Sequence, residues 1–395
     1  MRFESQVVHW GDRKRTPGVP VPSTTPIQLG TTFFYDSAET LDRVLGFEEP
    51  GYSYARYSNP TNAALEELAA KLEGGAGALA TASGMSAVQI ALQAALVDRR
   101  HSILASKDIY GATIGLLDQV FSLYEVETKY VDICDLGAVE KAIADGQPGC
   151  IFLESISNPL LRVPHIQRIG ELAAKAGAAL VVDNTFGTPM LLRPLELGAN
   201  IIVHSATKYL AGHGDVLGGI VISDAQHEQT VRNISRIIGP VLGPFESYLT
   251  MRGIKTLALR FERQCENARL LAEWLCGHPR IEHVYYCSIP SHPDAETIRE
   301  EFAPGLWGAI LSFEIRHADK AAVLGFMDRL RMVVPGSSLG DVHSLLLYPT
   351  IASHRNLSAK MRARMGIRDN LVRIAVGIEH IDDIKADLES ALVNE

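Results

Sequence analysis

Six short, almost entirely aliphatic segments constrain the fold of this 395-residue chain more than any other feature. They are predicted strands, at 78–82, 101–105, 149–155, 179–183, 200–205 and 219–223. Helical patterns separate most of them, at 85–97, 111–124 and 164–177. Strands this aliphatic have both faces buried, which is typical of a mostly parallel sheet covered by helices on each side. The sequence therefore predicts an α/β fold.

The pattern changes on either side of this region. A long helical stretch at 245–275 is followed by strand and helix patterns at 306–315, 318–330, 371–379 and 381–393, which indicate a smaller α+β domain. Before it, the string 16-TPGVPVPSTTP-26 cannot form a regular helix, and the aromatic residues that follow indicate that this segment packs on something. We therefore expect an arm at 1–60, a large domain at 61–250 and a small domain at 251–395.

Composition excludes several classes of partner. The net charge is −9 with no long basic run, so nucleic acids and anionic membranes are poor partners. The five cysteines are widely spread without a C-x-x-C motif, which indicates reduced thiols. No window approaches about 18 uninterrupted apolar residues, and the first residues contain no secretory signal pattern. We expect a cytoplasmic protein.

One lysine stands out, Lys208, in the string 204-HSATKYLAGHGDVLGG-219. It follows a predicted strand by three residues, and Asp183 ends another strand. Ligands of open α/β sheets bind outside the carboxyl ends of the strands, so both side chains should face one crevice. A partly desolvated lysine has a lowered pKa and becomes a nucleophile that can form a Schiff base. An aspartate beside it is the partner that a pyridinium nitrogen needs.

A phosphate site is predicted next to this pair. The glycine loop 83-SGMSA-87 lies between a strand and a helix, so its backbone N–H groups can bind a phosphate. Ser205 and Thr207 add hydroxyl groups beside the lysine. A lysine, an aspartate and a phosphate site together predict that the cofactor is pyridoxal phosphate.

The chain resembles the pyridoxal-phosphate enzymes of cysteine and methionine metabolism, which include cystathionine γ-lyase, cystathionine γ-synthase, cystathionine β-lyase, methionine γ-lyase and homocysteine-forming sulfhydrylases. The resemblance extends nearly end to end. It rests on the strings 54-YARYSNPT-61, 74-GGAGALATASGMSA-87, 154-ESISNP-159, 181-VVDNTFGTP-189, 193-RPLELGANIIVHSATKYLAGHGD-215, 251-MRGIKTL-257 and 371-LVRIAVGIE-379. It implies the fold of type I pyridoxal-phosphate transferases.

The resemblance also implies catalytic roles. Lys208 holds the cofactor and moves protons between Cα, Cβ and Cγ of the substrate. Asp183 pairs with the pyridine nitrogen, and Tyr110 stacks on the ring and acts as an acid or base near the leaving group. Arg373 pairs with the substrate α-carboxylate, with Ser338 nearby.

Further cofactor contacts follow from the same resemblance. They are Gly84, Met85, Ser205 and Thr207 at the phosphate, Asn158 at the ring, and Tyr54 and Arg56 from the neighbouring subunit. The protein is therefore expected to be at least a homodimer with shared active sites, and the resemblance implies a homotetramer built as a dimer of dimers.

The reaction is harder to predict than the cofactor. We favour γ-elimination, like that of cystathionine γ-lyase; the alternatives are γ-replacement on an O-acyl-homoserine, methionine γ-lyase activity and cystathionine β-lyase activity. Ala112 replaces the cysteine of methionine γ-lyases, and His343 replaces a glutamate suited to the distal ammonium of cystathionine. Arg355 either binds an additional anionic group of the substrate or caps a helix. His343 and Arg355 are thus candidate substrate contacts.

Two other classes of function fit the sequence less well. A non-catalytic scaffold with this fold would not need Lys208, Asp183, Tyr110 and Arg373 together. A metal-dependent hydrolase would need clustered His, Asp and Glu ligands, and His204, His213 and Asp215 lack the remainder of such a set. We expect no metal, and we expect packing or supporting roles for His204 and His213.

Overall fold

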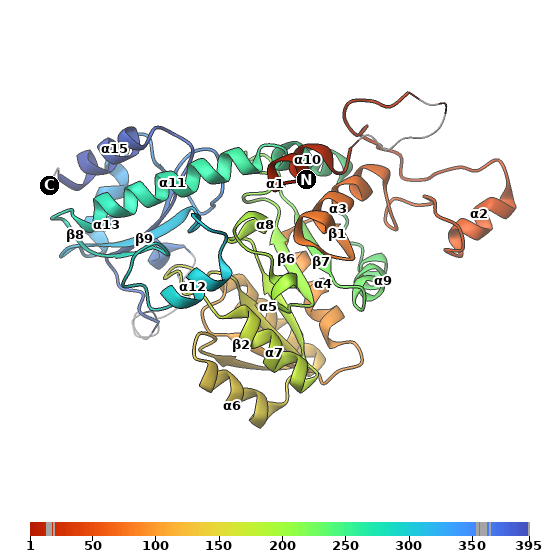
Figure 1. The fold of residues 1–395 in the computed structure, drawn as a ribbon, viewed down its shortest axis with the longest axis horizontal. Helices are drawn as coiled ribbons and strands as arrows, with labels where there is room; N and C mark the ends of the chain where they lie inside the picture. The colour runs from red at the N-terminus through yellow and green to blue at the C-terminus, as the bar shows by residue number, and fades with distance from the viewer. Residues whose placement is uncertain (13–17, 19, 353–354, 356–361, 363–364, 394–395) are drawn as a thin grey trace.

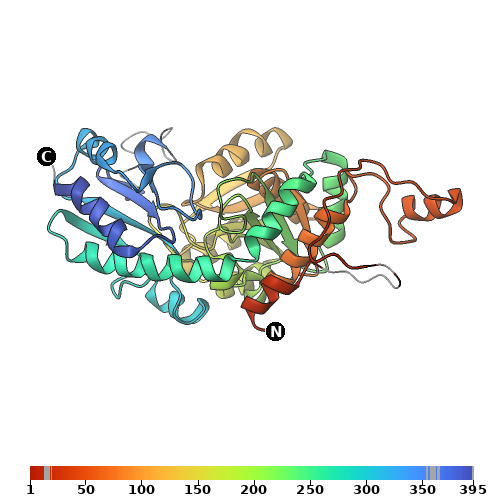
Figure 2. The same ribbon diagram turned by 90° about the horizontal axis from the view of Figure 1, so that it is seen from above.

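The fold consists of an extended N-terminal segment and two layered regions, each built around its own sheet (Figure 1). The computed structural model describes residues 1–12, 18, 20–352, 355, 362 and 365–393. Helix α1 (Phe3–His9) packs against the body of the molecule, whereas the segment that carries α2 (Ala38–Leu45) projects away from it in both views (Figures 1 and 2).

The first region contains a seven-stranded sheet. Its strands are β1 (Gly77–Thr81), β2 (Ser102–Ser106), β3 (Glu127–Val131), β4 (Cys150–Glu154), β5 (Ala179–Asp183), β6 (Ile201–Ser205) and β7 (Gly219–Ser223), in the order β1-β7-β6-β5-β4-β2-β3. Only β7 runs antiparallel to its neighbours. The predicted α/β fold with a mostly parallel sheet is confirmed, and each of the six predicted strands is present. Strand β3 was not predicted.

Helices cover both faces of this sheet. They are α3 (Pro60–Glu73), α4 (Gly84–Leu96), α5 (Gly111–Gln119), η1 (Phe121–Tyr124), α6 (Leu136–Gly146), α7 (Ile166–Ala176), α8 (Thr188–Leu191), η2 (Pro194–Leu197) and α9 (Glu228–Ile238). Successive strand residues alternate between the two faces: Val181 packs in the cluster with α4, and Val182 packs in the cluster with α3 and α7. Burial on both faces explains why the central strands consist mainly of apolar residues.

Local signals fix where the helices next to the site begin. The Asn59 side chain accepts hydrogen bonds from the N–H groups of Thr61 and Asn62, and Pro60 is the first residue of α3. Ser83 caps α4 in the same way by accepting from the N–H of Ser86. The capped end of α4 therefore lies at the carboxyl end of β1, where the chain leaves the sheet.

The second region contains a five-stranded sheet with the order β10-β11-β12-β9-β8. Its strands are β8 (Ile281–Tyr285), β9 (Ile310–Ile315), β10 (Val334–Pro335), β11 (Leu345–Leu347) and β12 (Leu371–Ala375). Its other elements are α12 (Ala295–Glu301), α13 (Lys320–Arg329), η3 (Pro349–Ile351) and α15 (Ile381–Val393). Strands β8, β10 and β11 were not predicted.

A long helix joins the two regions. The predicted helical stretch at 245–275 is divided into α10 (Pro244–Ile254) and α11 (Leu257–Cys276). On α11, Phe261 belongs to the core of the first region and Leu271 to the core of the second. The two hydrophobic cores are thus connected through one helix, and the domain limits remain a prediction.

A polar contact also connects the regions. Asp294, just before α12, accepts hydrogen bonds from Arg162 Nε at 2.7 Å, Arg162 Nη2 at 2.9 Å and the Val163 N–H at 2.9 Å. Asp294 is nearly buried and Arg162 is partly exposed. This contact fixes the chain that follows β4 against the second region.

Replacing Asp294 with alanine is expected to lower the free energy of unfolding by about 2 kcal/mol, because three donors lose their acceptor. Urea unfolding followed by circular dichroism measures the change. The matched control is Glu266→Ala, since Glu266 forms a similar two-pronged pair with Arg269 on an exposed helix surface. The control should lose less than about 0.5 kcal/mol. Equal losses for the two variants would show that the Asp294 contact stabilises the fold no more than an exposed ion pair does.

Candidate active site

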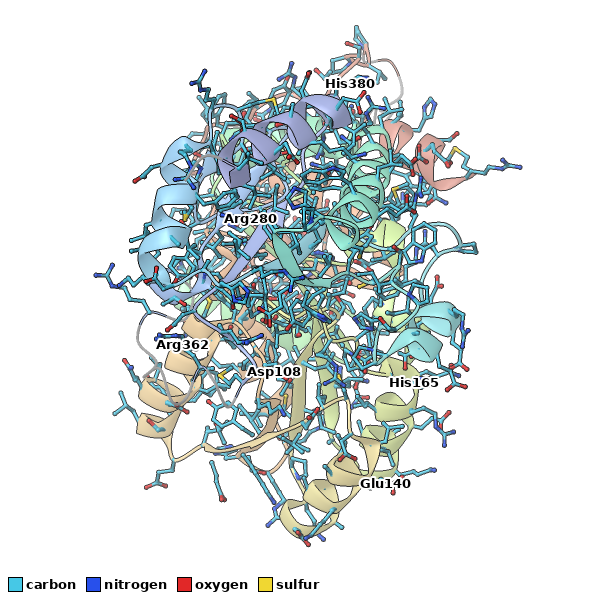
Figure 3. All side chains as sticks on the ribbon, turned by 90° about the vertical axis from the view of Figure 1, so that its left-hand side faces the viewer. Asp108, Glu140, His165, Arg280, Arg362 and His380 are labelled. Atoms are coloured by element: carbon cyan, nitrogen blue, oxygen red, sulfur yellow. The ribbon has the colours of Figure 1, made fainter. Side chains whose placement is uncertain are left out.

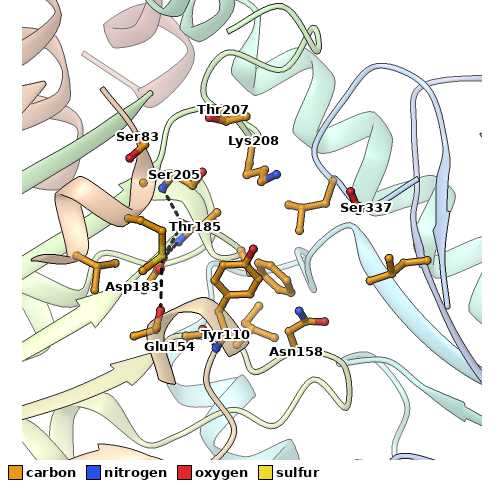
Figure 4. Close-up of a pocket in the computed structure, with 18 of the residues that line it drawn as sticks. Ser83, Tyr110, Glu154, Asn158, Asp183, Thr185, Ser205, Thr207, Lys208 and Ser337 are labelled. Carbon is orange, nitrogen blue, oxygen red and sulfur yellow. Dashed lines mark hydrogen bonds between the residues drawn. The ribbon is translucent and has the colours of Figure 1, made fainter. Parts of the chain in front are cut away.

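A pocket of about 480 Å³ opens at the carboxyl ends of β4, β5 and β6 (Figure 4). Both regions contribute to its wall. The first region contributes Ser83, Gly84, Met85, Val88, Tyr110, Thr113, Glu154, Ile156, Asn158, Asp183, Thr185, Phe186, Ser205, Thr207, Lys208 and Leu217, and the second contributes Ser337, Leu339, Leu347, Ala352 and Arg373. This is the edge of the sheet where the sequence predicted a ligand site.

Lys208 points into the pocket from the turn after β6 (Figure 4). Its Nζ donates a hydrogen bond to Ser338 Oγ at 2.8 Å. Burial, and next the positive charge of Arg373, lower the pKa of the Lys208 amine. A larger fraction of the amine is therefore neutral and nucleophilic near pH 7 than for an exposed lysine.

Two carboxyl groups lie at the inner end of the pocket. Asp183 Oδ1 accepts hydrogen bonds from the Thr185 N–H at 2.9 Å and the Thr185 hydroxyl at 2.5 Å. Glu154 pairs with Asp183 across β4 and β5, and its Oε1 accepts from the Tyr110 N–H at 2.6 Å. Burial raises the pKa of both groups, and the charge of Asp183 raises that of Glu154 further. A cation placed here would find a buried acid to pair with.

The capped end of α4 forms the next part of the wall. Because Gly84 and Met85 are the first residues of the helix, their N–H groups have no partner inside it. A Cβ at Gly84 would lie 2.8 Å from Ser205 Cβ, so only glycine allows the helix to approach β6 this closely. Thr207 Oγ1 accepts from the Gly218 N–H and donates to the Gly218 carbonyl. The N–H groups of Gly84 and Met85, with Ser205 beside them in the pocket wall, fit a phosphate.

Arg373 supplies a buried guanidinium from β12. Its Nη1 donates to Asn158 Oδ1 at 3.0 Å and its Nη2 to the Ser338 carbonyl at 3.0 Å. Its Nε is buried, and no described residue accepts a hydrogen bond from it. Burial lowers the pKa of Arg373 to about 10. A carboxylate fits here, because it would neutralise this cation.

Five of the predicted site residues are not among those that line this pocket, although one of them, Ser338, contacts both Lys208 and Arg373. Tyr54 is exposed, and Arg56 Nη1 donates to the Arg236 carbonyl while its guanidinium lies 4.7 Å from the centre of the Tyr57 ring. His343 lies on the surface with its Nδ1 3.4 Å from Asp341 Oδ1. Arg355 is exposed as well, and the neighbouring His354 lies outside the described residues.

Sequence reasoning missed several residues of the site. Glu154 and Thr185 lie within strings that carried the resemblance, yet their neighbours Asn158 and Asp183 received the roles. Leu217, Leu339 and Leu347 line the pocket but carry no chemical signal in the sequence. Within the described part of the chain, no three His, Cys, Asp or Glu side chains gather as a metal site requires. No described helix has the length and hydropathy to span a membrane.

The family model described as "Cys/Met metabolism PLP-dependent enzyme" matches residues 4–393. The chain belongs to this family. Its cofactor is pyridoxal phosphate, and the pocket described above fits that molecule. The members of this family are lyases and γ-replacing enzymes, so the predicted enzyme class is confirmed while the individual reaction is not determined.

Relatives with different names resemble the chain to a similar degree. It is 41% identical to an O-succinylhomoserine sulfhydrylase of Pseudomonas aeruginosa, over 99% of this chain and 95% of that protein. It is 37% identical to an L-methionine γ-lyase of Fusobacterium nucleatum subsp. polymorphum, over 98% and 96%. A cystathionine γ-lyase structure from Micromonospora echinospora matches with a TM-score of 0.91 and 35% identity, over 100% of both chains.

The raised pKa of the Glu154 carboxyl group predicts how the stability of this protein, in its cofactor-free form, depends on pH. Its folded-state pKa is raised above the ordinary value of 4.5, so the folded state binds the proton more tightly than the unfolded state. Its stabilising contribution is complete below that ordinary value and is lost as the pH rises through the raised pKa. Glu154→Gln does not titrate, yet it retains an acceptor for the Tyr110 N–H.

The Glu154→Gln variant is therefore expected to gain stability relative to the wild type as the pH rises from the ordinary carboxyl pKa of 4.5 toward the raised pKa of Glu154. Thermal unfolding at a series of pH values measures this difference. The control is Glu140→Gln, because Glu140, which is exposed on α6 (Figure 3), does not line the pocket. A difference that does not change with pH would show that Glu154 titrates normally.

Proposed function

We propose that this protein breaks the bond between Cγ and sulfur of an amino acid by γ-elimination. With water as co-substrate, the reaction gives 2-oxobutanoate, ammonia and a thiol. Three features support a reaction that begins at Cα of an amino acid: a lysine amine of lowered pKa, a buried acid and a guanidinium that lacks one partner. The observation that carries the proposal is the contact of Lys208 with Ser338, whose carbonyl also holds Arg373.

Each of these side chains would perform one step. Arg373 binds the substrate carboxylate and so places Cα near the Lys208 amine. Bound pyridoxal phosphate supplies a ring that accepts electrons from the carbanion at Cα. Asp183 keeps a proton on the nitrogen of that ring. Lys208 takes the proton from Cα and moves protons at Cβ, and Tyr110, at the mouth of the pocket, protonates the departing sulfur.

The remaining cofactor contacts are assigned to a second subunit. Tyr54 and Arg56 lie outside the pocket of their own chain, in the segment between α2 and α3. That segment exposes large apolar side chains, among them Leu29, Phe34 and Phe47, with 74%, 93% and 62% of their surface accessible. Apolar surface of this kind marks a site of association. We propose a homodimer in which each segment completes the partner's site, and two such dimers forming a tetramer.

A second reaction, γ-replacement on an O-acyl-homoserine, has specific support. Glu154 and Asp183 are the only carboxylates among the described residues that line the pocket, and both lie at its inner end. Among these residues, no carboxylate near the mouth would therefore attract the distal ammonium of cystathionine. The acyl ester of an O-acyl-homoserine would need no carboxylate there. The 41% identity to a sulfhydrylase points in the same direction.

Product analysis separates these reactions. The purified enzyme is incubated with L-cystathionine, L-homocysteine, L-methionine or O-succinyl-L-homoserine, each with and without an added thiol. γ-Elimination predicts 2-oxobutanoate from a sulfur substrate when no thiol is added. A new thioether or homocysteine that appears only with thiol and acyl-homoserine would favour γ-replacement, and pyruvate from cystathionine would indicate β-elimination.

Complementation between inactive subunits tests the shared site. Lys208→Ala and Arg56→Ala subunits are each expected to show little activity. Random co-assembly in equal amounts should restore about a quarter of the wild-type activity, because half of the dimers contain one intact site. Lys208→Ala mixed with Asp183→Ala is the control, since both residues belong to the same chain's site and no intact site can form. No recovery in the first mixture would refute the shared site.

A further inference from the structure

Behind the pocket, on the other face of the large sheet, lies a buried cluster of three polar side chains. Glu73 is the last residue of α3, His204 lies in β6, and Asn184 directly follows β5. Their exposed fractions are 1%, 2% and 0%. His204 Nε2 donates to Glu73 Oε1 at 2.6 Å, and Asn184 Nδ2 donates to the same oxygen at 3.0 Å.

The cluster lies on the face opposite the cofactor pocket. Because strand residues alternate, Ser205 and Val203 point toward α4 and the pocket, and His204 points toward α3. His204 is thus adjacent in sequence to Ser205, a residue of the pocket. Asn184 is likewise adjacent to Asp183, the acid at the inner end of the pocket.

Hydrogen bonds on both faces join the same two chain segments, 183–185 and 203–205. On the pocket side, the Ser205 N–H donates to Thr185 Oγ1 at 2.8 Å. At the sheet edge, the Asn184 N–H donates to the Val203 carbonyl at 2.9 Å. On the far side, Glu73 accepts from one residue of each segment. Hydrogen bonds on both faces of the sheet therefore fix the segment that contains Asp183.

We infer that Glu73 and His204 are positioning residues for Asp183, the acid that would pair with the ring nitrogen of pyridoxal phosphate. The inference rests on the proposed function, since it assigns that pairing to Asp183. Glu73 holds Asn184 and thereby fixes the direction of the Asp183 side chain. His204 keeps Glu73 in place and brings a group that can carry positive charge close to Asp183.

Electrostatics support this role. Burial raises the pKa of Asp183, and the hydrogen bonds from Thr185 and the positive charge of His204 act in the opposite direction. A charged His204 thus favours the ionised form of Asp183, which is the form that pairs with a protonated ring nitrogen. Without that charge, the buried acid would more readily hold the proton itself.

Stability alone accounts poorly for the cluster. Glu73 Oε2 and Asn184 Oδ1 are buried, and no described residue donates a hydrogen bond to them. Unpartnered buried oxygens reduce stability, and apolar side chains of similar size commonly replace a buried ion pair without loss. The turn is also packed tightly against Asn184, because a Cβ at Gly187 would lie 2.2 Å from Asn184 Oδ1.

Cofactor retention provides the test. Full-length holoenzyme is dialysed against graded concentrations of pyridoxal phosphate to obtain the dissociation constant, and the visible absorption of the bound cofactor is recorded. His204→Leu removes both the donor and the charge, and Glu73→Gln removes the charge of the carboxylate. Both variants are expected to bind pyridoxal phosphate about tenfold more weakly, the change that one pKa unit at Asp183 would produce. Their absorption band should also shift.

His204→Gln separates orientation from charge, because glutamine can still donate to Glu73. If His204→Gln binds the cofactor more tightly than His204→Leu but still has a shifted absorption band, both the hydrogen bond to Glu73 and the charge of His204 contribute. The matched control is His165→Gln, since His165 (labelled in Figure 3) does not line the pocket and its Nδ1 lies 2.7 Å from the buried Glu301 in a similar pair. This control should lower thermal stability without changing cofactor affinity or absorption.

Two results would overturn the inference. One is wild-type affinity and absorption in Glu73→Gln and His204→Gln. The other is a loss of affinity in His165→Gln equal to theirs at the same loss of thermal stability. If the wild type itself bound no pyridoxal phosphate, the proposed function would fail instead, so the two failures are distinguishable.

Discussion

The confinement of Lys208 and Arg373 within one partly buried pocket governs the chemistry of this protein. Burial first, and then repulsion by the nearby guanidinium, disfavour the charged form of the amine, so the pKa of Lys208 is lowered. The guanidinium cannot respond in this way at neutral pH, so it remains a charge that a carboxylate would neutralise. The same burial of two cations therefore prepares a nucleophile and a binding site for the anionic end of an amino acid.

This arrangement requires both regions of the chain to be fixed to each other. Lys208 belongs to the large sheet, whereas Arg373 and Ser338 belong to the second region. Helix α11 contributes to both cores, and Asp294 ties the second region to the segment after β4. That segment also carries Asn158, which accepts a hydrogen bond from Arg373. The position of the guanidinium thus depends on contacts made far from the pocket.

The sequence predicted those features that local pattern determines. Near-continuous aliphatic strands predicted the sheet, and the position of Lys208 and Asp183 after two of these strands predicted one shared pocket. Strand β3 was missed because it lies at the edge of the sheet, where Glu127 and Lys129 interrupt the apolar pattern. The contact between Glu73 and His204 spans 131 residues of sequence, and no periodicity reveals such a pair. Neither could the sequence show that His343 lies against Asp341 at the surface.

The two carboxyl groups at the inner end of the pocket, those of Asp183 and Glu154, differ in their hydrogen bonds and in the charges near them. Asp183 and Glu154 are register partners on adjacent strands, so both cannot ionise without strong repulsion. Asp183 accepts two hydrogen bonds from Thr185 and lies near His204, and all of these favour its charged form. Glu154 has one backbone donor and the full effect of burial. The charged form is therefore better supported at Asp183 than at Glu154, and a ring nitrogen that enters the pocket meets Asp183 in a defined direction.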